Sequence, residues 1–284
     1  MTFSIGNRTW ISTGDDSFSI AGSGGSPNII SELEYKGLDS TVWEVYGELG
    51  ERSEGFVLAT FGYGGIRNGT YRDSDYNGNN KTSLFSLSTG DVDNDKLWYF
   101  SIDYAYRIFQ RSYKRKRQKA SIDLLVGYQH WEEDLTFTNG VQVVPSTGAF
   151  SGLNSTYLFT WDSLRVGARG ILPIFHRFYL KGKALFIPWT EYEGKGVWNL
   201  RTDFRQNPSF KDEADSGFGV QLDAAIVYNI WHDLSVKVGY RYWWMESGSG
   251  TATTFLSNGT IVRQPFNEAV NKRHGTVIGV NYIF

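Results

Sequence analysis

Asp73 and Asp75 are the side chains of this chain best suited to acid–base chemistry, because two carboxylates one residue apart can hold and polarise a water molecule. Glu191 and Glu193 repeat that spacing. Taken alone, the aspartate pair is also what an ordinary polar loop contains. Its chemistry therefore depends on the elements that position it.

A second carboxylate run, Asp91, Asp93 and Asp95, has the alternation that opens a calcium-binding loop. Counted from Asp91, the sixth position is Lys96 instead of glycine and the twelfth is Ile102 instead of glutamate, which favours a solvated loop. The chain has no cysteine, so disulfides and thiolate metal ligands are excluded. We expect no metal and no cofactor other than a bound lipid.

The elements that must position these residues are β-strands. Apolar and polar residues alternate in runs along the whole chain, as between residues 234 and 244, and such runs approach or exceed the roughly 9–11 residues of a tilted membrane strand. Mean hydropathy is -0.35, and no run of about 18 apolar residues exists, which excludes a membrane helix. The 16% of aromatic residues suits the two aromatic girdles of a membrane barrel.

The end of the chain carries the clearest form of this pattern. Val280, Tyr282 and the terminal Phe284 fall on one face of a strand, as in the closing strand of a bacterial outer-membrane barrel. We expect this signal to be read by the barrel-assembly machinery. The predicted fold is all-β: a transmembrane antiparallel β-barrel of about ten strands, formed by residues 1–284 as a single domain.

The polar face of these strands is strongly charged, which fits a hydrated lumen and a lipid-facing outside. Side chains fill most of a narrow barrel, and isolated buried charges cost several kcal/mol each, so we expect these charges to pair across the lumen. An ion or solute pathway is the alternative. The expected inward set is Glu44, Glu48, Asp103, Arg107, Asp123, Arg165, Arg169, Lys181, Lys183, Asp223, Lys237 and Arg241.

The connections between strands are predicted to alternate in length. Short turns are expected at residues 50–54, 110–118, 173–177 and 231–233, and long polar loops near residues 22–28, 67–95, 138–153, 193–216 and 246–272. Short turns are periplasmic and long loops extracellular in outer-membrane barrels. The basic run at residues 114–117 then reads as a solvated turn near lipid phosphates.

This layout resembles the omptin family, the surface-exposed endopeptidases of enterobacterial outer membranes. Strand order and four short segments carry the resemblance: residues 31–36 (Ser-Glu-Leu-Glu-Tyr-Lys), 71–76 (Tyr-Arg-Asp-Ser-Asp-Tyr), 126–129 (Val-Gly-Tyr-Gln) and 282–284 (Tyr-Ile-Phe). It implies that Asp73 and Asp75 are a catalytic pair on the extracellular rim. It also implies a facing Asp-x-His dyad after the seventh strand, whose histidine is the base.

The chain departs from the omptin pattern at that dyad. The matching stretch, residues 189–196, contains Glu191 and Glu193 but no histidine. The four histidines fall elsewhere: His176 and His232 in short turns, and His130 and His274 on the lipid-facing parity of their strands. The proteolytic machinery implied by the resemblance is therefore incomplete.

Omptins also bind lipopolysaccharide on their outer wall through basic and aromatic residues. Tyr128 and His130 occupy positions like those of that site, whereas Glu132 stands where a basic residue is expected. The resemblance thus implies a partial lipopolysaccharide contact. The alternative is that Tyr128 and His130 are ordinary aromatic-girdle residues.

We predict a surface-exposed barrel in the outer membrane of a Gram-negative bacterium that acts through its extracellular loops in binding, adhesion or a structural role. Its partners would be outer-membrane lipid, the assembly machinery and an extracellular protein or peptide, with no nucleic acid. One alternative is an omptin-like endopeptidase in which Asp73 and Asp75 activate water and Glu191 or Glu193 replaces the missing base. A second alternative is a small-solute porin.

Overall fold

The computed structural model describes residues 2–51, 55–93, 95–113 and 118–284. Ten long strands occur in these residues: β1 (Thr2–Ile20), β2 (Ser31–Glu51), β3 (Gly55–Gly78), β5 (Asp95–Tyr113), β6 (Gln118–Val144), β8 (Ser155–Phe175), β9 (Phe178–Val197), β11 (Gly217–Asn229), β12 (Leu234–Ser247) and β14 (Ile261–Ile283). Four shorter ones are β4 (Thr82–Val92), β7 (Gly148–Ala149), β10 (Phe210–Ala214) and β13 (Gly250–Phe255), beside one 3₁₀ turn, η1 (Ser23–Gly25). Within these ranges, no helix has the length and apolar character needed to cross a membrane.

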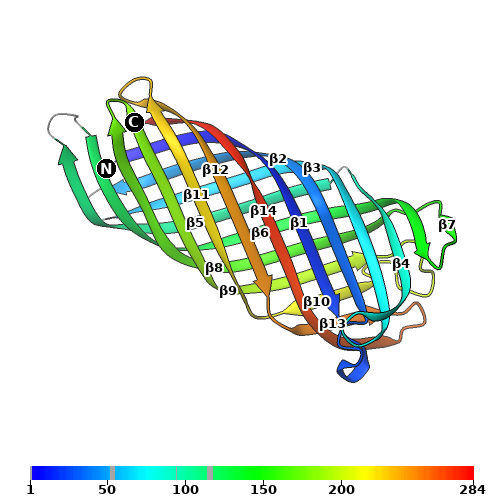
Figure 1. Cartoon of the computed structure of the whole chain (residues 1–284). Helices are drawn as coiled ribbons and strands as arrows, with labels where there is room; N and C mark the ends of the chain where they lie inside the picture. The colour runs from blue at the N-terminus through cyan, green and yellow to red at the C-terminus, as the bar shows by residue number, and fades with distance from the viewer. Residues whose placement is uncertain (1, 52–54, 94, 114–117) are drawn as a thin grey trace.

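The ten long strands form a closed antiparallel ring. Each pairs with the next in the order β1, β2, β3, β5, β6, β8, β9, β11, β12 and β14, and β14 pairs with β1 to close it. Figure 1 shows a long tilted barrel with both chain ends at the same end. The predicted all-β barrel of about ten strands is confirmed, with Val280, Tyr282 and Phe284 on or next to its closing strand.

The barrel has two different ends. At the turn end lie the chain termini and the short connections, of which residues 176–177 and 230–233 fall where the sequence predicts them. The basic run at 114–117 and residues 52–54 lie outside the described residues. At the opposite end, the loop end, β4, β7, β10 and β13 project beyond the ring (Figure 1).

Most of the segments predicted as long loops are strands. β4 pairs with β3 and β6, and β10 and β13 pair with each other and with β9 and β14. The prediction of unpaired polar loops over 67–95, 193–216 and 246–272 is therefore wrong for much of their length. Backbone N–H and C=O groups in these polar segments are satisfied by ladder bonds, so the wall continues well past the ring.

An apolar band surrounds the half of the barrel next to the turn end. Every strand of the ring exposes aliphatic or aromatic side chains there, as predicted for a lipid-facing surface. One residue for each strand is Ile5, Val45, Phe61, Tyr104, Val126, Val166, Leu180, Ile226, Val238 and Val280, all at least 40% exposed. We call this part the turn half and the remainder the loop half.

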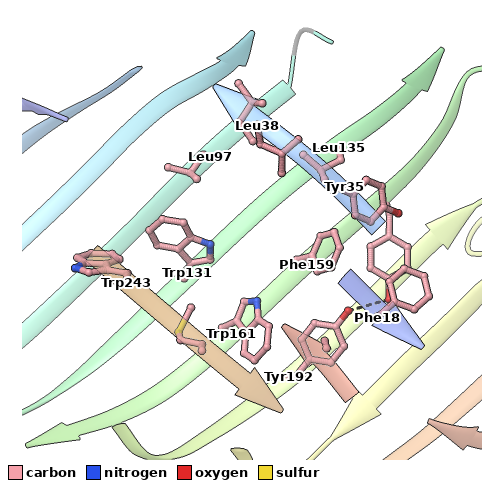
Figure 2. Close-up of a cluster of buried hydrophobic side chains, with 14 of the residues drawn as sticks. Phe18, Tyr35, Leu38, Leu97, Trp131, Leu135, Phe159, Trp161, Tyr192 and Trp243 are labelled. Atoms are coloured by element: carbon pink, nitrogen blue, oxygen red, sulfur yellow. Dashed lines mark hydrogen bonds between the residues drawn. The ribbon is translucent and has the colours of Figure 1, made fainter. Parts of the chain in front are cut away.

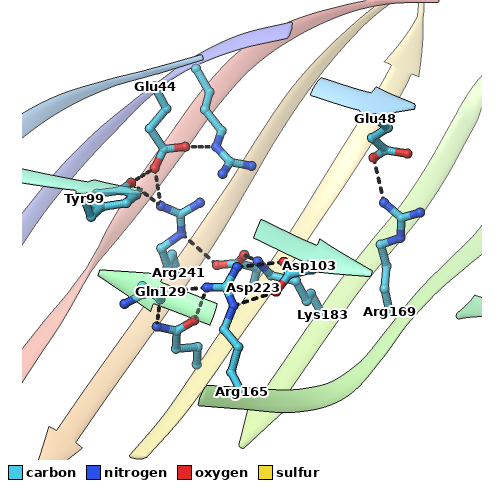
Figure 3. A network of polar contacts seen from close by, with 12 residues as sticks. Glu44, Glu48, Tyr99, Asp103, Gln129, Arg165, Arg169, Lys183, Asp223 and Arg241 are labelled. Atoms are coloured by element: carbon cyan, nitrogen blue, oxygen red, sulfur yellow. Dashed lines mark hydrogen bonds and ion pairs between the residues drawn. The ribbon is translucent and has the colours of Figure 1, made fainter. Parts of the chain in front are cut away.

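The inside of the turn half is filled by ion pairs, as predicted. The Arg165 guanidinium donates to both oxygens of Asp103 at 2.7 Å. Arg169 reaches Glu48 at 2.6 Å and Asp123 at 3.0 Å (Figure 3). Because each of these carboxylates meets a guanidinium across the lumen, the buried negative charges are compensated within the ring.

The uppermost part of this network joins three charges and a tyrosine. Glu44 accepts hydrogen bonds from Arg241 and from the Tyr99 hydroxyl, and Arg241 also donates to Asp223 at 2.8 Å (Figure 3). Arg8 forms a further ion pair with Glu44. The Glu44 carboxylate is therefore a junction between strands β1, β2, β5 and β12.

The loop half contains a core of buried aromatic side chains, which we call the aromatic plug (Figure 2). Tyr99 stacks on Trp131 with ring centroids 5.0 Å apart, and Trp10 packs on Trp243 at the same distance. The largest members are Trp10, Tyr35, Tyr99, Trp131, Tyr157, Phe159, Trp161, Tyr192 and Trp243, all almost fully buried. Burial of each large side chain contributes roughly 1.5–3 kcal/mol, so the plug is a major source of stability.

A bulge at Gly37 explains why different faces of β2 point inward in the turn half and in the loop half. In β2 the apolar residues Leu33 and Tyr35 point inward, whereas Trp43 and Val45, which are also at odd positions, point outward. The pairing register shifts between Lys36 and Asp39, and Gly37 has φ of 64°. Glycine adopts this left-handed conformation without steric cost, and the extra residue exchanges the two faces of the strand.

Replacing Glu44 by glutamine is predicted to lower the free energy of unfolding by about 3 kcal/mol, because Arg241 and Arg8 would face an uncharged amide in a buried site. The measurement is urea unfolding of the micelle-embedded barrel, followed by tryptophan fluorescence.

The matched control is Glu51→Gln, since Glu51 is exposed at the end of the same strand. Equal unfolding midpoints for the two variants would contradict a structural role for the Glu44 junction.

Candidate functional site

Asp73 and Asp75 lie on the inner side of β3 in the loop half, well beyond the apolar band. Their register partners on β2 are Leu33 and Ser31. The Asp75 carboxylate accepts hydrogen bonds from Ser31 and Ser86, which anchor it between β2 and β4. The structure therefore brings the predicted aspartate pair together inside the barrel mouth.

Burial keeps this pair from carrying two negative charges. Burial and, to a smaller extent, the neighbouring Asp75 carboxylate raise the pKa of Asp73 to about 8, against the opposing effect of the Arg201 guanidinium. Burial also raises the pKa of Asp75. Asp73 Oδ1 is buried and has no hydrogen-bond partner among the described residues. At neutral pH the pair is thus protonated on Asp73.

No histidine lies beside the aspartate pair. His130 and His274 point outward, as their parity predicted: His130 packs on Trp98 with ring centroids 4.8 Å apart, and His274 Nδ1 lies 2.7 Å from the exposed Tyr240 hydroxyl. His176 and His232 lie in turns at the opposite end of the barrel. All four side chains are too far away to deprotonate a water held by Asp73.

Glu191 and Glu193 do not converge on the aspartate pair either. Both lie on the outer face of β9, where Glu193 forms ion pairs with Lys195 and Lys211, while Tyr192 between them points into the plug. The expectation that these glutamates face Asp73 and Asp75 is therefore wrong.

A bulge opposite Arg165 is the physical reason for this orientation. Leu164 pairs with Trp189 and Val166 with Phe186, so two residues of β9 oppose one residue of β8. Such an insertion exchanges the faces of the strand beyond it.

Where an open cleft was expected beside the aspartates, tyrosines and a third aspartate close the barrel. The Tyr157 hydroxyl donates to Asp212 Oδ2 at 2.7 Å and lies 2.8 Å from the Tyr192 hydroxyl. Burial raises the pKa of Asp212 to about 7. The ring of Phe18 stacks on Tyr157 with centroids 4.4 Å apart.

The predicted lipid-contact residues form a cluster on the outer wall, just beyond the apolar band. His130 Nδ1 lies 2.8 Å from Asp162 Oδ1, and the Tyr128 hydroxyl donates to the same carboxylate. The Trp98 indole donates to Glu132 at 2.8 Å. Tyr128 and His130 are thus held by carboxylates, and their immediate partners are acidic.

The carboxylates at 91, 93 and 95 do not converge as calcium ligands. Asp91 and Asp93 are exposed, whereas Asp95 is buried, and Asp91 accepts a hydrogen bond from Asn139 at 2.8 Å. Over the ranges that the structure describes, no group of three His, Cys, Asp or Glu residues is placed to hold a metal ion.

Sequence reasoning missed Asp212, Tyr157 and Arg201, which shape the barrel mouth more than the glutamates do. Tyr157 begins a strand of alternating aromatic and polar residues, and the same alternation read with an inward aromatic face would have indicated a core. Arg201 and Asp212 lie in a segment of no clear periodicity, so no sequence signal pointed to them.

Comparison with known proteins supports the fold. The model of the Protochlamydia outer membrane protein (Pom) family matches residues 7–284. A search of curated proteins finds no match. Among solved structures, the outer membrane protease OmpT from Escherichia coli is similar, with a TM-score of 0.85, 12% identity, and coverage of 100% of this chain and 97% of that one.

Two autotransporter domains are similar at a lower level. The translocator domain of NalP from Neisseria meningitidis has a TM-score of 0.40 and 10% identity, with coverage of 98% of this chain and 88% of that chain. The transport unit of AIDA-I from Escherichia coli has a TM-score of 0.38 and 9% identity, with coverage of 98% and 90%. At these identities the likeness to OmpT shows the barrel fold alone, and membership of the omptin family stays a prediction.

Raising the pH from about 6 to about 9 is predicted to destabilise the loop half. The folded-state pKa values of Asp73 and Asp212, at about 8 and about 7, exceed the unfolded value of about 4. Stability from these groups is therefore fully present in acid and is lost as the pH rises through 7 and 8. The measurement is the urea midpoint of the micelle-embedded barrel across this range.

In the Asp73→Asn variant the urea midpoint should fall less steeply with rising pH, since asparagine mimics the neutral acid. Asp91→Asn, on the exposed side of β4, serves as the control and should keep the full decline. An Asp73→Asn profile as steep as that of the unmodified protein would show that Asp73 is already ionised at neutral pH.

Proposed function

The chain belongs to the Protochlamydia outer membrane protein (Pom) family, and we propose that it is a sealed, non-catalytic barrel of the outer membrane that binds a basic protein or peptide on the wall of its loop half. The loop end is taken to be extracellular, as in outer-membrane barrels with short turns on one side and longer hairpins on the other.

The observation that carries this proposal is the closure of the loop half. The aromatic plug and the Tyr157–Asp212 contact fill the space in which a cleft or channel would have to lie. The outer surface of the loop half is therefore the part that other molecules can contact. A surface site needs neither an open lumen nor an activated water.

The charges of the chain are distributed unequally between the two halves. Of the described residues, the turn half comprises 2–9, 43–51, 55–62, 101–113, 118–128, 164–186, 222–242 and 275–284. These residues carry 11 Lys or Arg against 7 Asp or Glu, whereas the loop half carries 12 Lys or Arg against 22 Asp or Glu.

Many of the acids in the loop half face solvent on the outer wall, which we call the acidic wall: Asp15, Asp39, Asp91, Asp93, Glu191, Glu213, Asp215 and Glu268. The side chains of the loop half that are not buried include 18 Asp or Glu and 11 Lys or Arg, and a surface with such an excess of negative charge attracts and orients cationic partners.

The endopeptidase alternative lacks support from the geometry of the mouth. Asp73 and Asp75 are buried side by side, and the residues expected to serve as the base, Glu191 and Glu193, face outward. We propose that the aspartate pair is a structural feature of the loop half, in which Asp75 joins β3 to β2 and β4 through Ser31 and Ser86.

The porin alternative is opposed by what fills the lumen. A solute would have to pass the Glu44 junction and then the stacked rings of Tyr99 and Trp131. The paired charges of the Glu44 junction and the close-packed rings of the aromatic plug both occupy the space that a continuous aqueous path would need.

The lipid and assembly contacts are proposed on local chemistry. Tyr128 and His130 lie at the upper edge of the apolar band, where aromatic residues meet lipid headgroups. Because Asp162 and Glu132 surround them, a lipopolysaccharide phosphate would need a divalent cation between itself and the wall. The exposed Phe284 at the end of the closing strand remains the proposed contact for the assembly machinery.

Binding of a fluorescent oligolysine to the barrel in dodecyl maltoside micelles tests the proposal. Fluorescence anisotropy should show saturable binding at about 50 mM salt that weakens at about 300 mM, as screening shortens the reach of the wall charges. The double variant Asp93→Asn/Glu268→Gln should bind several-fold more weakly, since both residues are exposed on the acidic wall.

The matched control removes the same charge from the other end, through Glu51→Gln/Asp233→Asn, and should leave binding unchanged. Oligolysine binding that is equally weakened by both double variants would mean that net charge, and not the acidic wall, attracts the ligand. No binding at low salt would refute the proposed class of partner.

A further inference from the structure

A cavity of about 310 Å³ occupies the mouth of the barrel at the turn end. All ten strands of the ring contribute to its described lining, so it is the lower part of the lumen and opens along the barrel axis. It lies at the end opposite to the acidic wall. Its floor is the ion-pair network shown in Figure 3, where Arg169 and Glu48 reach across from facing strands.

The lining of this cavity is cationic. Among the described residues, the lining includes four basic side chains, Arg107, Lys119, Arg169 and Lys181, and one carboxylate, Glu48. A second cavity of about 120 Å³ lies deeper and shares Arg169, Lys181 and Glu48 with the first.

The excess of positive charge persists when both cavities are taken together. They are lined by eight Lys or Arg and by three Asp or Glu residues. Adding Glu44 and Asp123, which bind lining arginines from behind, still leaves three more cations than carboxylates. Charges confined between low-dielectric walls produce a strong local field, and an excess of this size attracts counter-ions into the mouth.

The two arginines of the mouth are held in place before any ligand arrives. Asp123, which is fully buried, binds Arg107 Nε at 2.6 Å and Arg169 Nη2 at 3.0 Å. Both guanidinium groups also lie against the ring of Phe56, at 5.3 Å and 4.8 Å from its centroid.

Contacts with the described residues use three of the five N–H donors of each guanidinium, since Arg107 also donates to Gln110 and Arg169 to Glu48. Donors that are already ordered lose little entropy when they bind an anion.

We propose that this cavity binds the phosphate group of a small phosphorylated molecule from the compartment at the turn end. Guanidinium and ammonium groups are the side chains that bind phosphate most strongly, through charge-assisted hydrogen bonds to several oxygens. The volume holds a phosphate with a short organic group, and the remaining lining includes asparagine, glutamine and serine side chains that suit its hydroxyls. Because the plug closes the lumen above, the ligand enters and leaves by the same mouth.

The test is isothermal titration calorimetry of the full chain, refolded in dodecyl maltoside micelles, with glycerol 3-phosphate as the probe. We expect saturable binding at low ionic strength, about tenfold weaker in Lys181→Gln, since one charge-assisted contact is lost. Lys119→Gln, at the exposed rim, should weaken binding to a smaller extent and cannot disturb the ion pairs within.

Arg263→Gln makes the same charge change at the loop end, on an exposed residue, and should leave the affinity unchanged. Heat-modifiable gel mobility verifies that each variant is folded. A second arm uses glycerophosphoglycerol: binding as tight as that of the monoester would support the phosphate site and identify a phospholipid headgroup as its source. No saturable binding, an equal response to acetate, or equal weakening by Arg263→Gln would overturn the proposal.

Discussion

The constraint on which the rest of this structure depends is that the interior of a ten-strand ring must be filled, and that what fills it is set by what lies outside. Around the turn half the outer surface is apolar, so the alternate side chains that point inward are polar and pair as ions. Around the loop half the outer surface is charged, and the inward side chains form an aromatic core. The two fillings meet at Tyr99, whose ring stacks on Trp131 and whose hydroxyl donates to Glu44. Arg241 completes this boundary, since its guanidinium lies 4.7 Å from the ring centroid of Trp10 while it binds Glu44 and Asp223.

The likeness to OmpT extends over the whole chain at 12% identity, which is enough for a common architecture and says nothing about chemistry. Asp73 and Asp75 stand at a mouth that the plug has closed, and burial holds a proton on one of them. Because the aromatic plug closes the lumen, we propose that partners bind at the outer wall of the loop half and in the cationic cavity at the turn end. The opposite charges at the two ends of the barrel then result from how its side chains pack and require no conformational change.

The barrel and its charged lumen could be predicted from the sequence, because few other folds fit strands in which apolar residues alternate strictly with charged ones. The sequence also placed the four histidines correctly, since no bulge intervenes near His130 or His274. It failed where a single inserted residue exchanges the faces of a strand, as at Gly37 and opposite Arg165, because nothing in the composition of either segment announces a bulge. The bulge opposite Arg165 turns Glu191 and Glu193 outward, whereas the resemblance to omptins implied that they face the aspartates. The long polar segments were misjudged because polar residues in paired hairpins look the same in sequence as polar residues in loops.

The central claim is that the lumen is sealed, and the most direct measurement of it is single-channel recording of the refolded barrel in planar lipid bilayers. The account predicts no conductance steps over the voltage range at which the bilayer itself is stable, from protein shown to be inserted and folded. Reproducible steps of fixed size would contradict it, since ions could then cross both the Glu44 junction and the aromatic plug, and the chain would be a channel.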